Sequence, residues 1–460
     1  MLTLLVYIIN TSELAAQTAK GGLMKKNMVE LFAGVGGFRL GLERLNSGWE
    51  TSWFSQWEPG KKKQWAHDCY VYHFGDVKDL AGDYTTGIDV SEVDKRNIPD
   101  HTLLTGGFPC QDYSVAHSLS SSKGIEGKKG VLWWQIRDVL IAKRPPFVLL
   151  ENVDRLLKSP ASQRGRDFGI ILASFAQLGY RVEWRVINAA EYGAAQRRRR
   201  TFIFAYNETT EYAKRMDSQN PDEIIKETGL MAKAFPICGY KDIEIGNFDF
   251  TDVSDVDVDT MLTVGTAESD NDLINMTKDF QFGFMDAGYM MDGQITTMKV
   301  IPIDIEPTLL NKVVQSGVDE SYYIKQEDMP SWSYMKGAKK IPRTSKNGHS
   351  YVFSEGPIAF PDPLDRPGRT MLTSESTKNR STHVVADPAT GRLRLLTEIE
   401  AERLQGFDDD WTKNCLVDGE IEEMPKRMRY FCMGNALVVP MITRMGKEID
   451  EIIEKENKRG

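Results

Sequence analysis

The sequence has few cysteines, no long apolar run and no excess of basic side chains. Its five cysteines include no Cys-x-x-Cys pair, so the spacing suggests neither a zinc site nor a disulfide framework. We expect no metal and a reducing, cytoplasmic setting. The longest apolar stretch, near Leu2–Ile9, is far shorter than the ~20 residues that cross a membrane, and no basic residues precede it as in a secretory signal.

The net charge of −9 at first argues against a nucleic-acid partner, but the charge is unevenly spread. Residues 241–306 contain 15 acidic and 3 basic side chains, so the rest of the chain is slightly basic. The acidic run 252–260 lacks the glycine and glutamate positions of a calcium loop, and we interpret it as a solvated loop. Basic clusters at Lys61–Lys63 and Arg197–Arg200 leave a nucleic-acid partner open.

Composition divides the 460 residues into four segments. Residues 1–27 share no pattern with the rest of the chain, and we interpret them as an N-terminal extension from an over-long start of the reading frame. Short apolar runs alternate with helical patterns over 28–205, as in parallel α/β units. Glycine, proline, aspartate, serine and threonine are frequent over 206–390, which predicts a second, irregular domain. Helical periodicity returns over 391–460, which ends in a predicted closing helix.

Short apolar runs in the α/β segment predict strands at Met28–Phe32, Thr51–Ser55, His101–Thr105, Phe147–Leu150, Arg181–Asn188 and Thr201–Ala205. The first run leads into a glycine-rich turn, where Gly34, Gly36 and Gly37 precede a predicted helix. Glycine permits a tight turn and lets a ligand approach the main chain. Packing alone is an equally good explanation of such a turn.

Two acidic residues extend the glycine turn into a candidate ligand site. Glu58 follows the second predicted strand, at roughly the ~20-residue distance at which a carboxylate binds a ribose hydroxyl. The turn is not a full Gly-x-Gly-x-x-Gly, so a single adenosyl group fits better than a dinucleotide. Asp76 is placed to accept a hydrogen bond from an adenine amino group, and a solvent-exposed turn residue is the alternative interpretation.

Cys110 and Glu151 each follow a predicted strand, at the edge where open α/β sheets bind ligands. Cys110 lies on a Gly-Gly-Phe-Pro turn, which indicates a presented nucleophile, although a free thiol with a pKa of about 8.5 must be activated. Glu151 ends a fully apolar strand. If the two strands are neighbours, the thiol and the carboxyl group converge on one pocket; the alternative for Glu151 is a helix cap.

Four consecutive arginines, Arg197–Arg200, lead into the last predicted strand. Strand alternation would place Arg198 and Arg200 on one face and the other two on the opposite face. One pair would then reach the pocket, while the other meets solvent or phosphate. A purely solvated basic run is the usual alternative.

Six ordered motifs make the chain resemble the prokaryotic DNA (cytosine-5) methyltransferases. They are FAGVGG (32–37), GGFPCQDYS (106–114), ENV (151–153), QRRRR (196–200), RLLTEIEAERLQGF (394–407) and GNALVVP (434–440). The combination of Pro-Cys-Gln with Glu-Asn-Val is the most specific. The resemblance implies a Rossmann-like, S-adenosylmethionine-dependent methyltransferase sheet, with 206–390 as the target-recognition domain.

The resemblance also implies the chemistry. Cys110 would attack carbon 6 of a cytosine flipped out of duplex DNA, and Glu151 would hold and protonate ring nitrogen 3. Arg198 and Arg200 would contact the base carbonyl and the backbone. Carbon 5 would take the methyl group of S-adenosylmethionine, and loss of its proton would expel Cys110. The loop 117–130 would close over the pocket.

By the same resemblance, the co-substrate is bound by the three glycines of the turn and by Phe32, Trp57, Glu58, Asp76, Pro109 and Asn435. Trp57 would lie beside the adenine and Glu58 on the ribose, although the acid follows the tryptophan here and the family often has the reverse order. Glu398 replaces a usual proline, which affects helix entry and not chemistry. The resemblance further implies a monomer that acts on double-stranded DNA, in a restriction-modification role beside an independent endonuclease.

Three alternatives stay open from the sequence. An RNA (tRNA) cytosine-5 methyltransferase shares these motifs, but the long stretch 206–390 favours duplex DNA. A catalytically inactive DNA-binding paralogue would not need both Cys110 and Glu151. A generic α/β protein with a glycine turn leaves six ordered motifs unexplained. The target DNA sequence cannot be derived from the chain.

Overall fold

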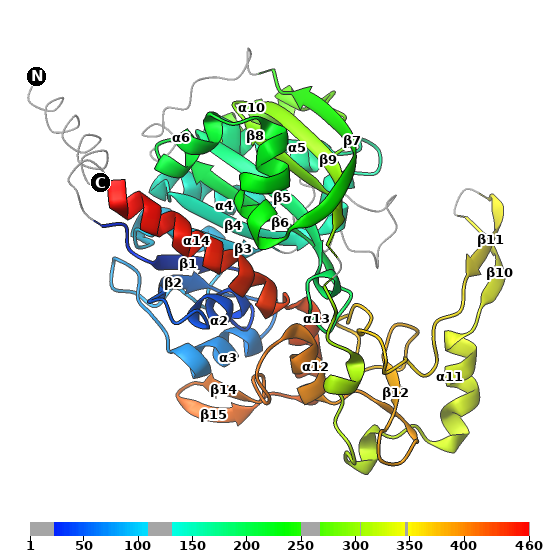
Figure 1. Cartoon of the computed structure of the whole chain (residues 1–460). Helices are drawn as coiled ribbons and strands as arrows, with labels where there is room; N and C mark the ends of the chain where they lie inside the picture. Colours follow the sequence, from blue (N-terminus) through cyan, green and yellow to red (C-terminus); the bar gives the residue numbers. More distant parts are fainter. Residues whose placement is uncertain (1–22, 109–130, 250–266, 304, 346–347, 460) are drawn as a thin grey trace, which may run out of the picture.

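One large mixed sheet organises the molecule. The computed structural model describes residues 23–108, 131–249, 267–303, 305–345 and 348–459. Within these ranges, nine strands form a sheet in the order β2-β1-β3-β4-β6-β5-β8-β9-β7 (Figure 1). The strands are β1 (Asn27–Leu31), β2 (Glu50–Ser55), β3 (Leu103–Gly107), β4 (Phe147–Val153), β5 (Tyr180–Asn188), β6 (Arg199–Asn207), β7 (Ile237–Asn247), β8 (Ala287–Met291) and β9 (Gln294–Pro302).

The direction of the strands changes across the sheet. Parallel α/β units, the pattern predicted for 28–205, describe only β2, β1, β3 and β4, which run parallel to one another. β6 and β5 run antiparallel to their neighbours. All six predicted strands are present, and the predicted boundaries differ from the observed ones by at most three residues. The parallel half places the ends of four strands at one edge.

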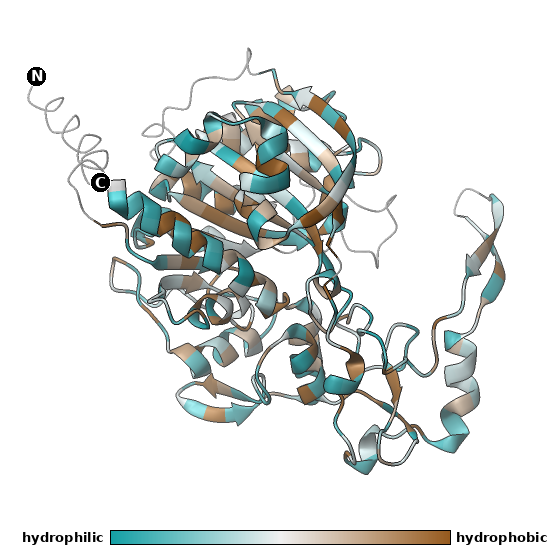
Figure 2. Ribbon diagram, viewed as in Figure 1, coloured by the Kyte–Doolittle hydropathy of each residue, from teal (hydrophilic) through white to brown (hydrophobic). Residues whose placement is uncertain are grey.

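Helices cover both faces of this sheet, because alternate side chains of each strand point to opposite sides. Val148 and Leu150 of β4 pack with α4 and α5, whereas Phe147 and Leu149 belong to the core beneath α2, α3 and α14. These helices are α2 (Gly37–Glu43), α3 (Trp65–Phe74), α4 (Val131–Lys143), α5 (Arg166–Gln177) and α14 (Val439–Arg459). Figure 2 shows the apolar strands at the centre and a hydrophilic outer face on α14.

The sheet continues into the segment predicted to be an irregular second domain. The described residues between 206 and 302 include α6 (Glu211–Asp217), α7 (Pro221–Glu223), α8 (Leu230–Ala234), α10 (Ala267–Met276) and the strands β7, β8 and β9. β8 pairs with β5, so these three strands extend the main sheet. A separate body follows only after Pro302, and it contains the irregular part of the segment (Figure 1).

That separate body is built from short elements. It includes α11 (Met329–Lys336), the hairpin β10 (Lys339–Thr344) and β11 (Ser350–Glu355), and the pair β12 (Val384–Ala386) and β13 (Leu393–Leu395). The chain then returns to the sheet through α12 (Glu398–Gln405), β14 (Asn414–Val417), β15 (Glu420–Glu423), α13 (Lys426–Asn435) and α14. α12 starts with a capping box between Thr397 and Glu400, so Glu398 in place of proline leaves a well-formed helix entry.

Candidate active site

Four parallel strands end at the same edge of the sheet. Leu31 of β1 pairs with Ser55 of β2 and with Gly106 of β3, and Gly107 pairs with Glu151 of β4. The segments that follow these strands therefore meet at one edge. The sequence left open whether the strands before Cys110 and Glu151 are neighbours, and the structure shows that β3 and β4 are hydrogen-bonded to each other.

The glycine-rich turn begins with a backbone outlier. Phe32 has a φ of 54°, a region that residues other than glycine rarely adopt and that is concentrated at ligand sites. Gly34 also has positive φ, and a Cβ built on it would meet nothing within 4 Å. At Gly36 and Gly37 a Cβ would instead lie 2.5 Å from Phe74 and 3.1 Å from Leu437. Gly34 thus leaves open space, while the other two permit close packing.

Two residues that the sequence did not single out connect this turn to Asp76. The backbone N–H of Gly34 donates to the side-chain oxygen Oε1 of Gln56 at 2.7 Å, and the backbone N–H of Gln56 donates to the Thr86 carbonyl at 2.9 Å. The Thr86 hydroxyl donates to Asp76 Oδ1 at 2.6 Å. The turn, the end of β2 and Asp76 are therefore one hydrogen-bonded unit. Gln56 lies directly before Trp57 and Glu58, whereas no sequence signal marks Thr86.

Trp57 and Glu58 follow β2 at the same edge. Trp57 is 37% exposed, an unusual state for a tryptophan. Partial burial raises the pKa of Glu58, and Lys61 opposes that shift. Burial raises the pKa of the Cys432 thiol on α13, and the Glu58 charge adds to that shift. Asn435, the last residue of α13, is exposed.

Glu151 lies over the Gly-Gly end of β3. A Cβ built on Gly107 would be 3.5 Å from Glu151 Oε2, so glycine leaves room for the carboxylate there. Arg200 Nε lies 2.7 Å from Glu151 Oε1, and their side chains are 18% and 11% exposed. Asn152 donates to the Phe108 carbonyl at 3.4 Å, which joins the two strand ends. The carboxylate and the guanidinium thus form an ion pair at an edge of the sheet where both side chains are mostly, but not completely, shielded from solvent.

Arg198 has a different environment from Arg200. It is buried, and it donates to the main-chain carbonyls of Met371 at 3.1 Å and Gly434 at 2.9 Å. The shared face predicted for Arg198 and Arg200 does not form, because β6 begins at Arg199 and strand alternation does not reach Arg198. Gln196 is also buried, and it accepts from the Met371 amide at 2.9 Å.

The nucleophile predicted from the sequence lies outside the described residues. Cys110, Pro109 and the loop 117–130 all belong to that part of the chain. The described chain reaches Phe108, which is buried and packs near Trp133 with ring centroids 6.2 Å apart. Phe108 directly continues the strand end that faces Glu151.

Glu30 is a fully buried carboxylate beneath the glycine turn, and no pattern in the sequence singles it out. Tyr70 donates to Glu30 Oε2 at 3.3 Å, and the amides of Phe38 and Arg39 also point to this carboxyl group. Burial raises its pKa to about 8 despite these donors and the Arg39 charge. Glu30 is held in the interior behind the turn and not at the open edge.

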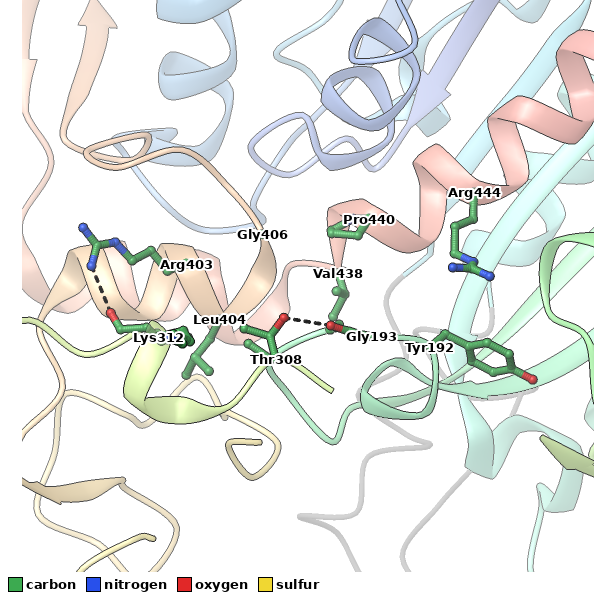
Figure 3. Close-up of a pocket in the computed structure, with 13 residues that line it drawn as sticks. Tyr192, Gly193, Thr308, Lys312, Arg403, Leu404, Gly406, Val438, Pro440 and Arg444 are labelled. Carbon is green, nitrogen blue, oxygen red and sulfur yellow. Dashed lines mark hydrogen bonds between the residues drawn. The ribbon is translucent and has the colours of Figure 1, made fainter. Parts of the chain in front are cut away.

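A cavity of about 400 Å³ is lined by none of these candidate site residues (Figure 3). Arg403, Lys312 and Arg444 are among its lining side chains. Arg403 is paired with Asp409, and Arg444 donates to the Ala234 carbonyl at 3.0 Å. Two of its three cations are thus already engaged by the protein.

Two other features, a metal site and a membrane-spanning helix, are absent from the described residues. No group of three or more histidine, cysteine or acidic side chains within them is arranged to hold a metal ion. None of the described helices is long and apolar enough to cross a membrane.

A family model described as C-5 cytosine-specific DNA methylase matches residues 26–451. The type II methyltransferase M.Sau3AI of Staphylococcus aureus is 47% identical over 433 residues, which cover 93% of this chain and 96% of that protein. The type II methyltransferase M.HhaI of Haemophilus parahaemolyticus is 30% identical over 178 residues, 39% of this chain and 48% of that protein.

Among solved structures, the Entamoeba histolytica methyltransferase EhMeth superposes with a TM-score of 0.54 at 13% identity, covering 94% of this chain and 98% of that one. A DNMT2 mutant of Spodoptera frugiperda gives a TM-score of 0.52 at 10% identity and covers 94% and 100% of the two chains. At such low identity these likenesses concern the fold alone.

Proposed function

Because the chain belongs to the C-5 cytosine-specific DNA methylase family, we propose that its chemistry takes place where β3 and β4 end, with S-adenosylmethionine bound at the neighbouring ends of β1 and β2. The chain methylates carbon 5 of cytosine in DNA. The family predicted from the motifs and the α/β methyltransferase fold are confirmed. The roles of individual residues and the order of the steps are our proposal.

The observation that carries the assignment is the contact between Glu151 and Arg200 over Gly107. Nitrogen 3 and the carbonyl oxygen of cytosine are adjacent on the ring, so one base edge can meet both side chains. Glu151 would hold and protonate nitrogen 3, and Arg200 would hold the carbonyl oxygen. Arg198 would position the main chain at Met371 and Gly434 and would not contact the base, because its guanidinium group already donates to these two carbonyls.

We assign the nucleophile to Cys110, three residues after Gly107. Cytosine carbon 5 is a poor nucleophile until a bond forms at carbon 6. The Cys110 sulfur would bond to carbon 6 while Glu151 protonates nitrogen 3, which leaves an electron pair available at carbon 5. After that carbon is methylated, solvent water would take its proton, which restores the ring double bond, breaks the carbon–sulfur bond, releases the Cys110 thiolate and returns the proton of nitrogen 3 to Glu151.

The edge near β1 and β2 fits an adenosyl group. Gly34 leaves open space, and the unit of Gln56, Thr86 and Asp76 fixes the walls around it. Trp57 offers an accessible ring face for adenine, and Glu58 offers a carboxylate for the ribose hydroxyls. S-adenosylmethionine supplies the methyl group when bound. Gly36, Gly37, Phe32, Pro109 and Asn435 would shape the same site.

The base must leave the DNA duplex to reach this edge, at a cost of a few kcal/mol. We propose that target recognition belongs to the body after Pro302, within the segment 206–390, and that 391–460 completes the catalytic domain. The relatives are type II methyltransferases, which supports a role in a type II restriction-modification system, with the endonuclease a separate protein. We further propose a cytoplasmic monomer.

Bisulfite sequencing of plasmid DNA from cells that express the chain tests the function and finds the target together. We expect protected cytosines within one short sequence, and unprotected plasmid with Cys110→Ser. Purified tRNA, assayed beside DNA with labelled S-adenosylmethionine, tests the RNA alternative. Methylation of tRNA without methylation of DNA would refute the proposed substrate. Full activity of Cys110→Ser would remove Cys110 from the mechanism.

A further inference from the structure

The β10–β11 hairpin extends from the body that follows Pro302 (Figure 1). Its strands pair only with each other within the described chain, and their residues are exposed or half-buried throughout. An isolated two-stranded hairpin is at best marginally stable in water. This one therefore needs support from elsewhere in the structure.

That support comes from two cations at the base of the hairpin, Arg380 and Lys336. Arg380 donates to the carbonyls of Met335 at 2.8 Å and Gly337 at 3.0 Å, before β10, and to the carbonyl of Gly356, after β11. Lys336 is 1% exposed, and its ammonium group donates to the Arg380 carbonyl at 2.8 Å. The two ends of the hairpin are thus fixed, while its length carries little packing.

The two faces of the hairpin differ in character. One face carries the pair Ile341 and Phe353, with the Arg343 guanidinium 4.0 Å from the Phe353 ring centroid. The opposite face, which we call the outer face, carries the pairs Lys340–Ser354, Pro342–Val352 and Thr344–Ser350. All six outer-face residues are exposed, and Val352 is 60% exposed. Ile341 and Phe353 on the first face are half-buried, although Tyr351 on that face is 44% exposed, whereas every residue of the outer face is exposed.

The composition of the outer face matches the edges of base pairs. A two-stranded ribbon fits the major groove of B-DNA, where hydroxyl groups bind base edges, an apolar side chain contacts the thymine methyl group, and ammonium groups bind the phosphates beside the groove. The described hairpin residues also carry Lys339, Lys340 and Arg343 against one carboxylate, Glu355. This excess of positive charge favours the binding of a polyanion such as DNA. Another exposed hairpin, β14–β15, carries three glutamates and is unsuited to one.

We propose that the outer face of β10–β11 enters the major groove of the target DNA and supplies base contacts that determine the methylated sequence. This inference rests on the proposed function, since it names the element through which that function selects its DNA. Arg380 and Lys336 are positioning residues, because they hold the base of the hairpin and leave the outer face free for DNA.

The test measures binding of the full chain to two duplexes by fluorescence anisotropy. One duplex carries the site found by bisulfite sequencing, and the other carries the same bases in scrambled order. We expect Ser350→Ala/Val352→Ala to weaken binding to the site at least about tenfold and to reduce the preference for it, because base contacts carry discrimination. Lys340→Ala should weaken binding to both duplexes and lower the salt dependence of binding.

The matched control is Ile421→Ala/Glu422→Ala in β14–β15, where Ile421 is 64% exposed. This variant should leave the preference for the site duplex over the scrambled duplex unchanged. Thermal unfolding checks that the variants are folded, which the exposure of the altered residues predicts. Unchanged affinity, preference and salt dependence in both hairpin variants would overturn the inference. If the unaltered chain methylates no DNA, the proposed function fails instead, and the two failures are therefore distinguishable.

Discussion

Replacing Glu30 by Gln should change how the stability of the protein depends on pH. Glu30 is fully buried behind the glycine turn, and its pKa is raised from 4.5 to about 8 in the folded state. The folded protein therefore binds this proton more tightly than the unfolded chain does. The stabilisation from the protonated form is complete below about pH 4.5 and is lost as the pH rises through 8. Gln keeps the shape without titrating.

The shift in the pKa of Glu30 sets the size of the effect. At ~1.4 kcal/mol per pKa unit, full ionisation would cost roughly 5 kcal/mol, of which roughly 2 to 3 kcal/mol develops between pH 5 and pH 7. The free energy of unfolding of Glu30→Gln, relative to the unaltered protein, should therefore rise by that amount over this interval. Because both proteins share every other titrating group, the difference isolates Glu30.

Urea unfolding of both proteins at pH 5, 6, 7 and 8 measures this difference. Glu420→Gln, an exposed carboxylate on β15, controls for the loss of one negative charge. A difference between Glu30→Gln and the unaltered protein that stays constant with pH would refute the reasoning. So would a difference that falls as the pH rises, since that is the sign expected of a carboxylate stabilised in its ionised form.

The candidate site and its supporting glycines lead to three more predictions. DNA with 5-fluorocytosine at the target should form a covalent complex that survives denaturing electrophoresis, because fluorine replaces the proton that must leave; Cys110→Ser should form none, and an adduct with that variant would contradict the assignment. Glu151→Gln should lower turnover by about 10²–10⁴-fold and keep the calorimetric affinity for S-adenosylmethionine. Weakened co-substrate binding would make Glu151 a structural cap. Gly434→Ala should destabilise the fold by about 1–3 kcal/mol, because its Cβ would lie 2.4 Å from the Thr373 nitrogen, whereas Gly356→Ala meets open space and should change the melting temperature little.

The parallel core of the fold could be predicted from the sequence because its signals are local. The apolar runs that became β1 to β4 are short and bounded by glycine or polar residues, and Glu151 directly ends its apolar run. The antiparallel course of β5 and β6 could not be predicted, since a buried apolar run has the same appearance in either direction. The extension through β7, β8 and β9 was missed because frequent glycine and acidic residues indicated an irregular domain.

The site residues were predictable only where a motif adjoins a strand. Arg200 lies next to β4 through the pairing of Val153 with Arg200, which a local pattern can suggest. The partners of Arg198 lie 173 and 236 positions further along the chain, so no local pattern reveals them. The same holds for Thr86, whose hydroxyl connects Asp76 to its surroundings. Long-range hydrogen bonds of this kind become visible only in the folded structure.

The two carbonyls that hold Arg198 have a consequence during synthesis. A ribosome makes the chain from its amino end, and domains begin to fold as they emerge. The guanidinium of Arg198 emerges long before Met371 and Gly434 do, and until then these two acceptors cannot offset the cost of its burial. The hydrogen bonds that fix Arg198 therefore cannot be completed until the chain has been translated past Gly434. Shortened products that end before α13 should accordingly leave host DNA unmodified.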